Sequence, residues 1–221
     1  SQWLQHDGRS QVLVFFAGWG MDEAPFRHLT CAEYDLCVCF DYRETQLPSE
    51  ISDQWKSYDD MTLVAWSFGC AVAAHAMNSH PQLPIRDSLA INGTVSPASD
   101  DCGIPTRLLD ATAEKLPSGG WAKFVTRMCR DESVRQKFAE RAPQRDVQEA
   151  VAELQSLRDL PAPPSCPFRR ALIGADDRII APQNQQRGWD RFDIPTHSID
   201  APHYPFHLWT DWEEILAVGQ Q

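Results

Sequence analysis

The stretch "LVAWSFGCAVAAHAM" at residues 63–77 changes character in its middle. Its first residues are apolar and predict the end of a buried strand, whereas from Phe68 onward apolar residues recur at helical spacing. Ser67 stands at the corner, between the small residues Ala65 and Gly69. Small flanking residues are typical of a tight strand-to-helix turn that exposes a nucleophile. The alternative is an N-cap serine that opens an ordinary helix.

Apolar runs alternate with helical stretches along most of the chain. This alternation predicts an α/β fold with a mostly parallel central sheet covered by helices on both faces. Strands are expected within residues 11–20, 34–42, 61–66, 87–93, 167–177 and 192–200. Helices are expected behind Ser67 and at 207–219, after the last strand.

One block breaks the alternation. Residues 94–165 contain no convincing strand but hold long helical stretches, at 119–142 and 146–160, and end in a proline-rich segment. We expect a single domain over residues 1–221, with a core at about 1–93 and 166–221. The block at about 94–165 is expected to be a helical lid inserted above the sheet.

Composition narrows the possible classes of protein. The net charge of −11 disfavours binding to nucleic acid. No apolar run approaches the roughly 20 residues that span a bilayer, and the first residues lack the features of a signal peptide. The seven cysteines form no CxxC pair, so we expect free buried thiols rather than a zinc site. A cytoplasmic protein with no membrane partner, metal or organic cofactor is expected.

A nucleophilic serine needs a base and an acid, which in this fold class follow it in the order serine, acid, histidine. The segment "ALIGADDRIIAP" places Asp176 and Asp177 directly after a late strand. His203 lies in the loop after the last strand, whereas its rival His207 lies at the start of the final helix. The residues therefore indicate a Ser67–His203–Asp triad, in which spacing alone does not separate the two aspartates.

Acyl transfer also needs donors for an oxyanion. One is expected to be the backbone N–H of Phe68, directly after the serine, and the other that of Trp19 in the loop "AGWG" at 17–20. This loop does not match a dinucleotide-binding fingerprint, because Glu23 stands where the third glycine would be. The Trp19 side chain is interpreted as a wall of the acyl pocket, near Trp66, rather than as ordinary core.

The chain resembles the BioG-type pimeloyl-acyl carrier protein (ACP) methyl ester esterases. The resemblance rests on "FFAGWG", "FDY" (40–42), "VAWSFG", "INGT" (91–94), "GIP" (103–105), "DRIIAPQNQ" (177–185) and "HY" (203–204). It implies the α/β-hydrolase fold and hydrolysis of the methyl ester of pimeloyl-ACP in the synthesis of the biotin precursor. The family pattern also selects Asp177 over Asp176 as the acid, with Asp200 as an outside candidate.

A carrier-protein substrate predicts a basic docking surface, because acyl carrier proteins are acidic. Residues 105–145 hold nine Lys or Arg against five acids, although the whole chain is acidic. Three of these cations recur at helical spacing and are predicted to share one face that docks the carrier: Lys123, Arg127 and Arg130. Phe124 and Met128 are predicted to face the acyl tunnel. The alternative is a solvated lid surface with ordinary charges.

Two other classes of function compete with this interpretation. A general short-chain carboxylesterase or an acyl thioesterase would use the same fold and the same triad. A hydrolase-fold protein that only binds its partner is the third possibility, but such a protein has no need for a serine, an acid and a histidine in register.

Overall fold

Seven strands form one sheet in the computed structural model, which describes residues 1–220. In chain order they are β1 (Gln2–Gln5), β2 (Gln11–Phe16), β3 (Asp35–Cys39), β4 (Asp60–Trp66), β5 (Ile85–Ile91), β6 (Arg170–Gly174) and β7 (Thr196–Ile199). Their order across the sheet is β1-β3-β2-β4-β5-β6-β7, and all neighbours from β3 to β7 run parallel. The mostly parallel sheet that the sequence predicts is therefore confirmed.

The first strand is absent from the sequence-based expectations. β1 is short and polar and pairs antiparallel with β3, with Gln2 opposite Val38. Such an edge strand carries no continuous apolar run, because only one of its sides pairs with the sheet. Each of the six predicted strands is present within its expected range or begins within two residues of it.

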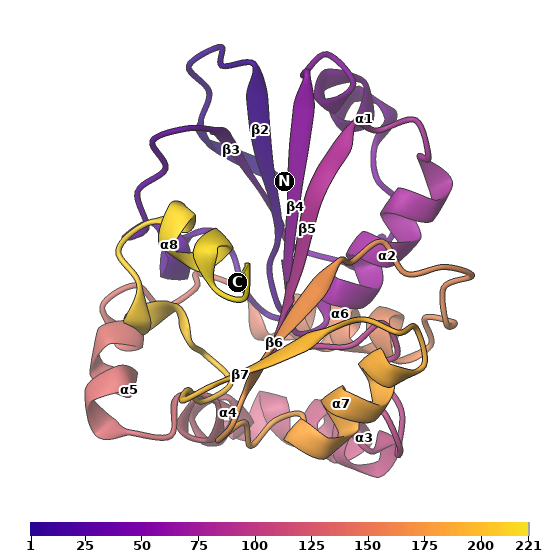
Figure 1. Cartoon of the computed structure of the whole chain (residues 1–221). Coiled ribbons are helices and arrows are strands. Elements are labelled where there is room, and N and C mark those ends of the chain that lie inside the picture. The colour runs from indigo at the N-terminus through magenta and orange to yellow at the C-terminus, as the bar shows by residue number, and fades with distance from the viewer. Residues whose placement is uncertain (221) are drawn as a thin grey trace.

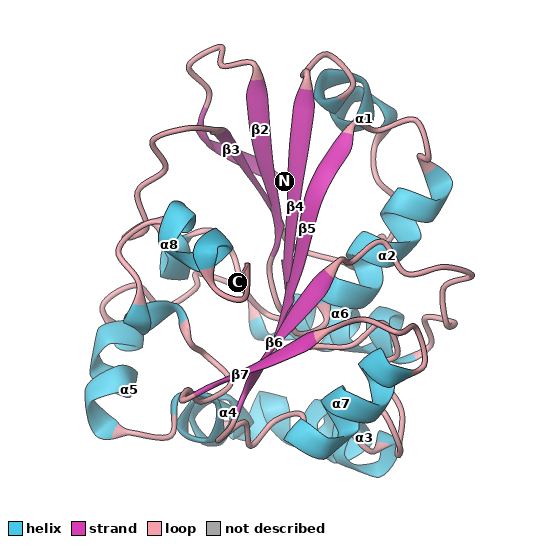
Figure 2. Cartoon of the chain, viewed as in Figure 1, coloured by secondary structure: helices cyan, strands magenta, loops and turns pink. Residues whose placement is uncertain are grey.

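Helices cover both faces of the sheet, as Figures 1 and 2 show. Those outside the long block between β5 and β6 are α1 (Ser49–Trp55), α2 (Gly69–Ser79), α7 (Pro182–Asp190) and α8 (Trp212–Ala217). In Figure 1, α1 and α2 lie on one side of β2, β4 and β5, and α8 lies on the other. The predicted final helix at 207–219 is shorter than expected, because a 3₁₀ turn precedes it and Asp211 caps α8 at its N-terminus.

Four helices lie between β5 and β6 in the chain. They are α3 (Thr106–Lys115), α4 (Gly120–Cys129), α5 (Glu132–Ala139) and α6 (Val147–Arg158). Figure 1 shows α3, α4 and α6 gathered beyond the carboxyl ends of β4 and β5, at the bottom of the view. We call the four helices the lid. In open α/β sheets this end of the strands is where ligands bind.

The expected continuous helix over 119–142 is wrong. Arg130 has φ 62° and ends α4, and α5 begins two residues later. A left-handed residue is rare outside glycine, asparagine and aspartate, so no pattern of apolar spacing announces such a break. The break turns α5 away from α4 and redirects the side chain of Arg130.

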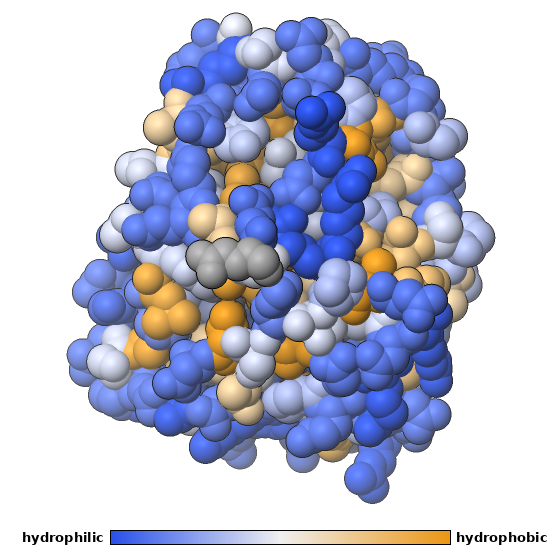
Figure 3. Space-filling model, viewed as in Figure 1, coloured by the Kyte–Doolittle hydropathy of each residue, from blue (hydrophilic) through white to orange (hydrophobic). Residues whose placement is uncertain are grey.

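The core is built from strands that are apolar on both faces. β2 and β4 are almost wholly buried, as helices on either side of a parallel sheet require. Phe15 packs against Trp212 of α8 with a ring-centroid separation of 4.8 Å. All seven cysteines are free and six of them are buried, as the sequence predicts. Hydrophilic residues cover most of the face in Figure 3, and apolar groups show only in separate small areas.

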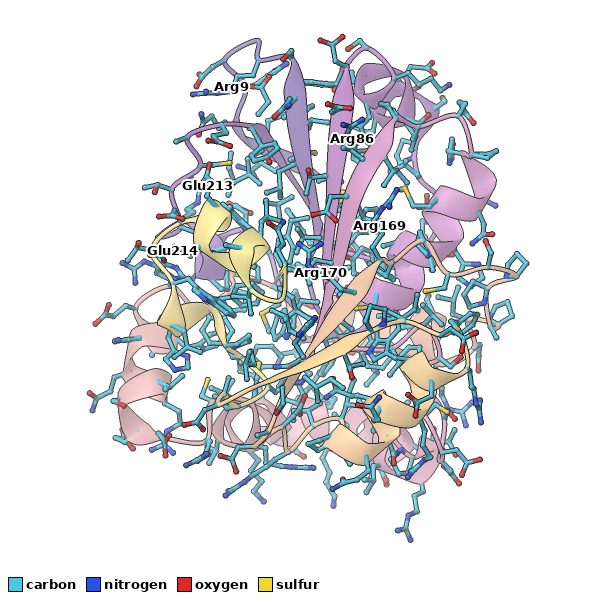
Figure 4. All side chains as sticks on the ribbon, viewed as in Figure 1. Arg9, Arg86, Arg169, Arg170, Glu213 and Glu214 are labelled. Atoms are coloured by element: carbon cyan, nitrogen blue, oxygen red, sulfur yellow. The ribbon has the colours of Figure 1, made fainter. Side chains whose placement is uncertain are left out.

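A partly buried ion pair and a backbone hydrogen bond tie the last helix to the sheet. The Arg170 guanidinium lies 2.7 Å from Asp87 on β5 and donates to the carbonyl oxygen of Leu216 at 2.9 Å. Figure 4 shows Arg170 beside the sheet, with Glu213 and Glu214 on α8. These contacts fix the segment that follows the predicted histidine loop. Within residues 1–220, no helix is both long and apolar enough to cross a membrane.

Candidate active site

Ser67 occupies the sharp turn between β4 and α2. Its φ is 57°, and its backbone N–H donates to the carbonyl oxygen of Ile91 at 3.0 Å. The N-cap of α2 is Phe68, whereas the Ser67 hydroxyl lies beside a histidine. A strained, non-glycine residue held by its surroundings is typical of functional sites. The nucleophile interpretation of this corner therefore fits the geometry better than the N-cap alternative.

Close backbone approaches explain why glycines surround the turn. A Cβ atom at Gly69 would lie 2.3 Å from the carbonyl oxygen of Phe16 on β2. A Cβ atom at Gly93 would lie 2.5 Å from the carbonyl oxygen of Ser67. Both distances are far below van der Waals contact, so the turn can form only where these positions lack side chains.

Three predicted side chains meet at this turn. His203 Nε2 lies 3.0 Å from Ser67 Oγ, and His203 Nδ1 lies 2.7 Å from Asp177 Oδ2. The three residues are all buried, with 4% of Ser67, 5% of Asp177 and 1% of His203 exposed. Burial in a low dielectric strengthens both hydrogen bonds. The arrangement has the mutual geometry of a nucleophile, a base and an orienting acid.

The acid is Asp177 in this geometry rather than Asp176. Asp177 also accepts hydrogen bonds from the N–H groups of Ile179 and Ile180 at 2.8 and 2.9 Å, and from Gln185 Nε2 at 2.8 Å. The two N–H groups bind Oδ1, whereas Gln185 shares Oδ2 with His203, so both oxygens of the carboxylate are held in place.

The three rejected candidates lie elsewhere. Asp176 pairs with the guanidinium of Arg130. The outside candidate Asp200 is exposed to solvent. His207 Nδ1 lies 3.1 Å from the carbonyl oxygen of Tyr204 instead of near the serine. None of the three contacts Ser67 within the residues that the structure describes.

Two residues hold the histidine loop, and sequence reasoning did not assign either of them that role. Asn92 follows β5 with φ 43°, and its side-chain amide donates to the carbonyl oxygens of Pro202 and His203 at 2.9 and 3.0 Å. Its side-chain oxygen accepts from Gly174 N–H at 2.6 Å. The indole of Trp66 donates to the same His203 oxygen at 2.8 Å. The signal for Asn92 is an Asn-Gly pair directly after a strand, where asparagine tolerates positive φ.

Two backbone N–H groups point to the chemistry of an oxyanion. Among residues 1–220, neither Trp19 N–H nor Phe68 N–H donates to a backbone or side-chain acceptor. Both residues line the same cavity as Ser67. Free donors beside a nucleophile are what a tetrahedral intermediate needs.

A narrow cavity of about 30 Å³ leads to Ser67 and His203. Trp19, Trp66 and Phe124 line it as predicted, and the lid supplies further apolar walls from Ile104, Leu108, Leu109 and Leu154. Met128 was also predicted to line this cavity, and that is wrong. Its side chain is fully buried in the core and does not belong to the cavity lining, because Met128 lies one helical turn beyond Phe124 on the same face of α4.

A wider cavity of about 320 Å³ lies outside the narrow one. The two share four lining residues, namely Leu108, Thr112, Phe124 and Arg127. Lys115, Lys123 and Arg127 give the outer cavity a basic rim. Lys115 and Lys123 are exposed, and neither forms an ion pair within residues 1–220. We call this outer cavity the mouth.

The expectation that Arg130 shares a helix face with Lys123 and Arg127 is wrong. Arg130 lies beyond the end of α4, and its guanidinium contacts the carboxylates of Asp131 and Asp176. Its charge is therefore already compensated. Arg127 differs, because it stays exposed at the mouth and donates to the carbonyl oxygen of Arg178 at 2.7 Å.

Metal ligands do not gather in the part of the chain that the structure describes. No group of three or more His, Cys, Asp or Glu side chains is arranged to hold an ion there.

The fold and the site together define an α/β-hydrolase of the esterase type. A solved esterase from Exiguobacterium antarcticum has the same fold, with a TM-score of 0.71 at 15% identity over 90% of this chain and 87% of that one. The α/β-hydrolase fold implied by the sequence resemblance is confirmed.

This chain belongs to the BioG family. The family model described as "Pimeloyl-ACP methyl esterase BioG" matches residues 1–215. The crystal structure of BioG from Haemophilus influenzae superposes with a TM-score of 0.82 at 28% identity, covering 97% of this chain and 99% of that one.

Two curated proteins are similar in sequence. A protein of Bacteroides fragilis named malonyl-[acyl-carrier protein] O-methyltransferase is 38% identical over 200 residues. That match covers 89% of this chain but only 40% of the Bacteroides protein, so this chain spans about two fifths of that relative's length. An uncharacterized protein of Haemophilus influenzae is 29% identical over 209 residues, covering 92% of this chain and 93% of that protein.

Proposed function

We propose that this protein is a serine esterase that hydrolyses the methyl ester of pimeloyl-ACP. The single observation that carries the proposal is His203, which bridges Ser67 and Asp177 inside a cavity. Membership of the BioG family supports the substrate, because the family's description contains it. The class of reaction follows from the site, and the particular ester follows from the family.

The reaction begins when Ser67 Oγ attacks the ester carbonyl carbon while His203 Nε2 accepts its proton. Asp177 holds the ring in the correct orientation and stabilises the imidazolium. The N–H groups of Trp19 and Phe68 stabilise the negative charge on the carbonyl oxygen. The tetrahedral intermediate collapses, the C–O bond to the methoxy group breaks, and His203 protonates the departing methanol.

The second half of the reaction reverses these roles. His203 removes a proton from water, and the resulting nucleophile attacks the acyl-Ser67 carbon. The bond to Ser67 Oγ breaks and the hydroxyl regains its proton. The products are the free distal carboxylate, still carried by the ACP, and methanol.

The two cavities support an unbranched, tethered acyl chain. The narrow cavity beside Ser67 is walled by apolar side chains such as Leu109 and Leu154, which suits a chain of methylene groups. The mouth lies further out and has a volume of about 320 Å³. An acyl chain that enters by the mouth can place its far ester at Ser67 while its attachment to the carrier stays outside.

The carrier protein is proposed to dock over the mouth. Lys115, Lys123 and Arg127 offer three cations there, and an acidic carrier complements them. The docking set therefore differs from the one that the sequence predicts, because Lys115 replaces Arg130.

Mass spectrometry of methyl-pimeloyl-ACP after incubation with the protein tests the proposal, with Ser67→Ala as the control. Loss of the methyl group alone, absent in the control, is the expected result. Release of the free carrier thiol instead would identify a thioesterase. Unchanged substrate, together with hydrolysis of short free esters, would leave a general carboxylesterase.

A further inference from the structure

The loop that carries the oxyanion donor is held from outside the sheet. The loop at residues 17–21 follows β2 directly and precedes a 3₁₀ turn at Ala24–Phe26, and the N–H of Trp19 belongs to this loop. Gly20 has φ 73°, so the loop bends sharply at a residue with little conformational preference of its own. Its geometry must therefore come from its neighbours.

The lid supplies two of those contacts from helix α6. The indole of Trp19 donates to the carbonyl oxygen of Ala150 at 2.7 Å. The backbone N–H of Gly20 lies 3.3 Å from Glu153 Oε2 and donates to it. One turn of α6 thus forms hydrogen bonds with the side chain of Trp19 and with the peptide group between Trp19 and Gly20.

Glu153 also joins this loop to the end of β3. Its Oε1 atom accepts from the N–H of Tyr42 at 3.1 Å. The Tyr42 hydroxyl in turn lies 2.8 Å from the carbonyl oxygen of Ala17, at the start of the loop. The Glu153 carboxylate therefore binds the loop directly at Gly20 and holds its start at Ala17 indirectly, through Tyr42.

The carboxylate is fully buried and has a charged partner. Glu153 has 0% exposure, and Arg145 Nη2 lies 3.4 Å from its Oε2 atom. Arg145 also donates to the carbonyl oxygen of Met21, the last residue of the loop, at 3.0 Å. Burying a charge is costly unless it is paired and hydrogen-bonded, and here Arg145, Gly20 and Tyr42 supply those partners.

We propose that Glu153 is a positioning residue for the oxyanion donor of Trp19. From α6 it fixes the peptide between Trp19 and Gly20, so that the Trp19 N–H keeps its direction toward the cavity. It touches neither Ser67 nor His203 within the described residues, so its effect on the reaction passes through the loop. The inference rests on the proposed function, because it takes Ser67 as the nucleophile.

Replacing Glu153 with Gln tests this inference. A Gln side chain replaces one carboxylate oxygen with an NH₂ group, which is a donor only and faces the N–H of Gly20 or of Tyr42 without accepting from it. Removing a whole oxyanion donor costs about 10²- to 10³-fold in kcat. We expect a misplaced donor to lower kcat about tenfold for 4-nitrophenyl butyrate, with KM within about twofold.

A tetrahedral mimic separates positioning from mere packing. Butylboronic acid becomes tetrahedral when it adds to a serine oxygen and then places a hydroxyl where the oxyanion forms. Its dissociation constant should rise about tenfold in Glu153→Gln, in parallel with the fall in kcat. Unchanged kcat and unchanged affinity for the boronic acid would overturn the inference, as would a change in KM alone.

The matched control is Glu149→Gln. Glu149 lies on the same helix and pairs with Arg43 and Arg145, but it is only partly buried and forms no hydrogen bond with residues 17–21. Its kcat and its affinity for the boronic acid should match the wild type. A tenfold loss there as well would show a general effect of charge on α6 and would overturn the specific role of Glu153.

Two further variants keep the outcomes distinct. If Glu153→Gln does not fold, Trp19→Phe is used in its place. It removes the other contact between α6 and the loop, the hydrogen bond from the indole to the carbonyl oxygen of Ala150. Lower kcat with weaker binding of the boronic acid in that variant supports the inference, and unchanged values overturn it. If Ser67→Ala still hydrolyses the ester, the proposed function has failed, and with it the premise of the inference.

Discussion

The two halves of the site are supported by different parts of the molecule. The nucleophile, base and acid are held by the sheet and its own loops, through groups such as Asn92 and Gln185. The loop of Trp19 is held by helix α6 of the lid, through Ala150 and Glu153. A change in the lid should therefore weaken oxyanion stabilisation before it disturbs the triad.

This difference predicts separate effects for substitutions in the core and in the lid. Most supports of the triad are buried groups of the core, and the lid adds one bond beside it, from the N–H of Tyr204 to the carbonyl oxygen of Met128 at 3.1 Å. The oxyanion loop reaches its working geometry only when the lid is docked. We expect substitutions in the core to act on stability and chemistry together, and substitutions in the lid to act on kcat or KM at nearly constant stability.

The largest effect is expected for Asp177→Asn. An amide oxygen can still accept from the N–H groups of Ile179 and Ile180, but the variant no longer favours the working tautomer of His203. A comparable change in a serine protease lowers kcat about 10⁴-fold, and we expect a loss of that order for a short ester. The matched control is Asp176→Asn, which should change kcat less than about twofold. A larger loss in the control would reassign the acid.

The next effect is expected for Asn92→Ala, in the core half. The change removes three buried hydrogen bonds and places alanine at a positive φ. We expect the free energy of unfolding to fall by about 3 kcal/mol, since each lost partner leaves a buried polar group unsatisfied. Urea unfolding measures it, with Asn78→Ala on α2 as the control. Equal losses in both variants would show that Asn92 is an ordinary structural residue.

A smaller effect is expected at the mouth of the cavity. The double change Lys115→Glu and Lys123→Glu should raise KM for methyl-pimeloyl-ACP about tenfold and leave kcat unchanged, because charge complementarity acts on encounter. KM for a free short ester should not move. Arg169→Glu is the control, since Arg169 is an exposed cation beside the sheet (Figure 4). An equal rise in that variant would indicate net charge rather than a docking surface.

The smallest effect concerns pH. Burial raises the pKa of Glu153 to about 7 against the lowering effects of Arg145 and of the N–H groups of Tyr42 and Gly20, and Asp41 contributes a smaller rise within that value. Between about pH 4.5 and 7 the folded protein holds a proton that the unfolded chain releases. The contribution of Glu153 to the free energy of unfolding therefore falls as pH rises through this window.

Thermal unfolding at two pH values measures this contribution. Glu153→Gln removes the titration, so its Tm relative to the wild type should be higher at pH 8 than at pH 5. One pKa unit corresponds to about 1.4 kcal/mol, or about 3 °C for a chain of this length. A constant difference in Tm between pH 5 and pH 8 would contradict the assignment.

The core half of the site could be predicted from the sequence because its signals are local. Ser67 stands between a strand and a helix, and His203 follows the last strand before a final helix. Asp177 needed the family pattern, since its neighbour Asp176 has the same local context. The edge strand β1 was not predicted, because it is a strand through its pairing with β3 and has no apolar pattern of its own.

The lid half could not be predicted in the same way. The break at Arg130 depends on one left-handed residue, and it moved Arg130 off the predicted face. Met128 was expected in the cavity but lies in the core, because apolar spacing does not say where along a helix face the cavity ends. Glu153 gave no signal, since a single acid on a helix usually faces solvent.

The most direct test of the account is to find which residue a fluorophosphonate modifies. Such reagents phosphorylate only a serine that a neighbouring base activates. Peptide mapping by mass spectrometry after labelling should place the added mass on Ser67 in the wild type. No label should appear in Ser67→Ala or in His203→Ala. Labelling of another residue, or no labelling of a folded wild-type protein, would contradict the assignment of the active site.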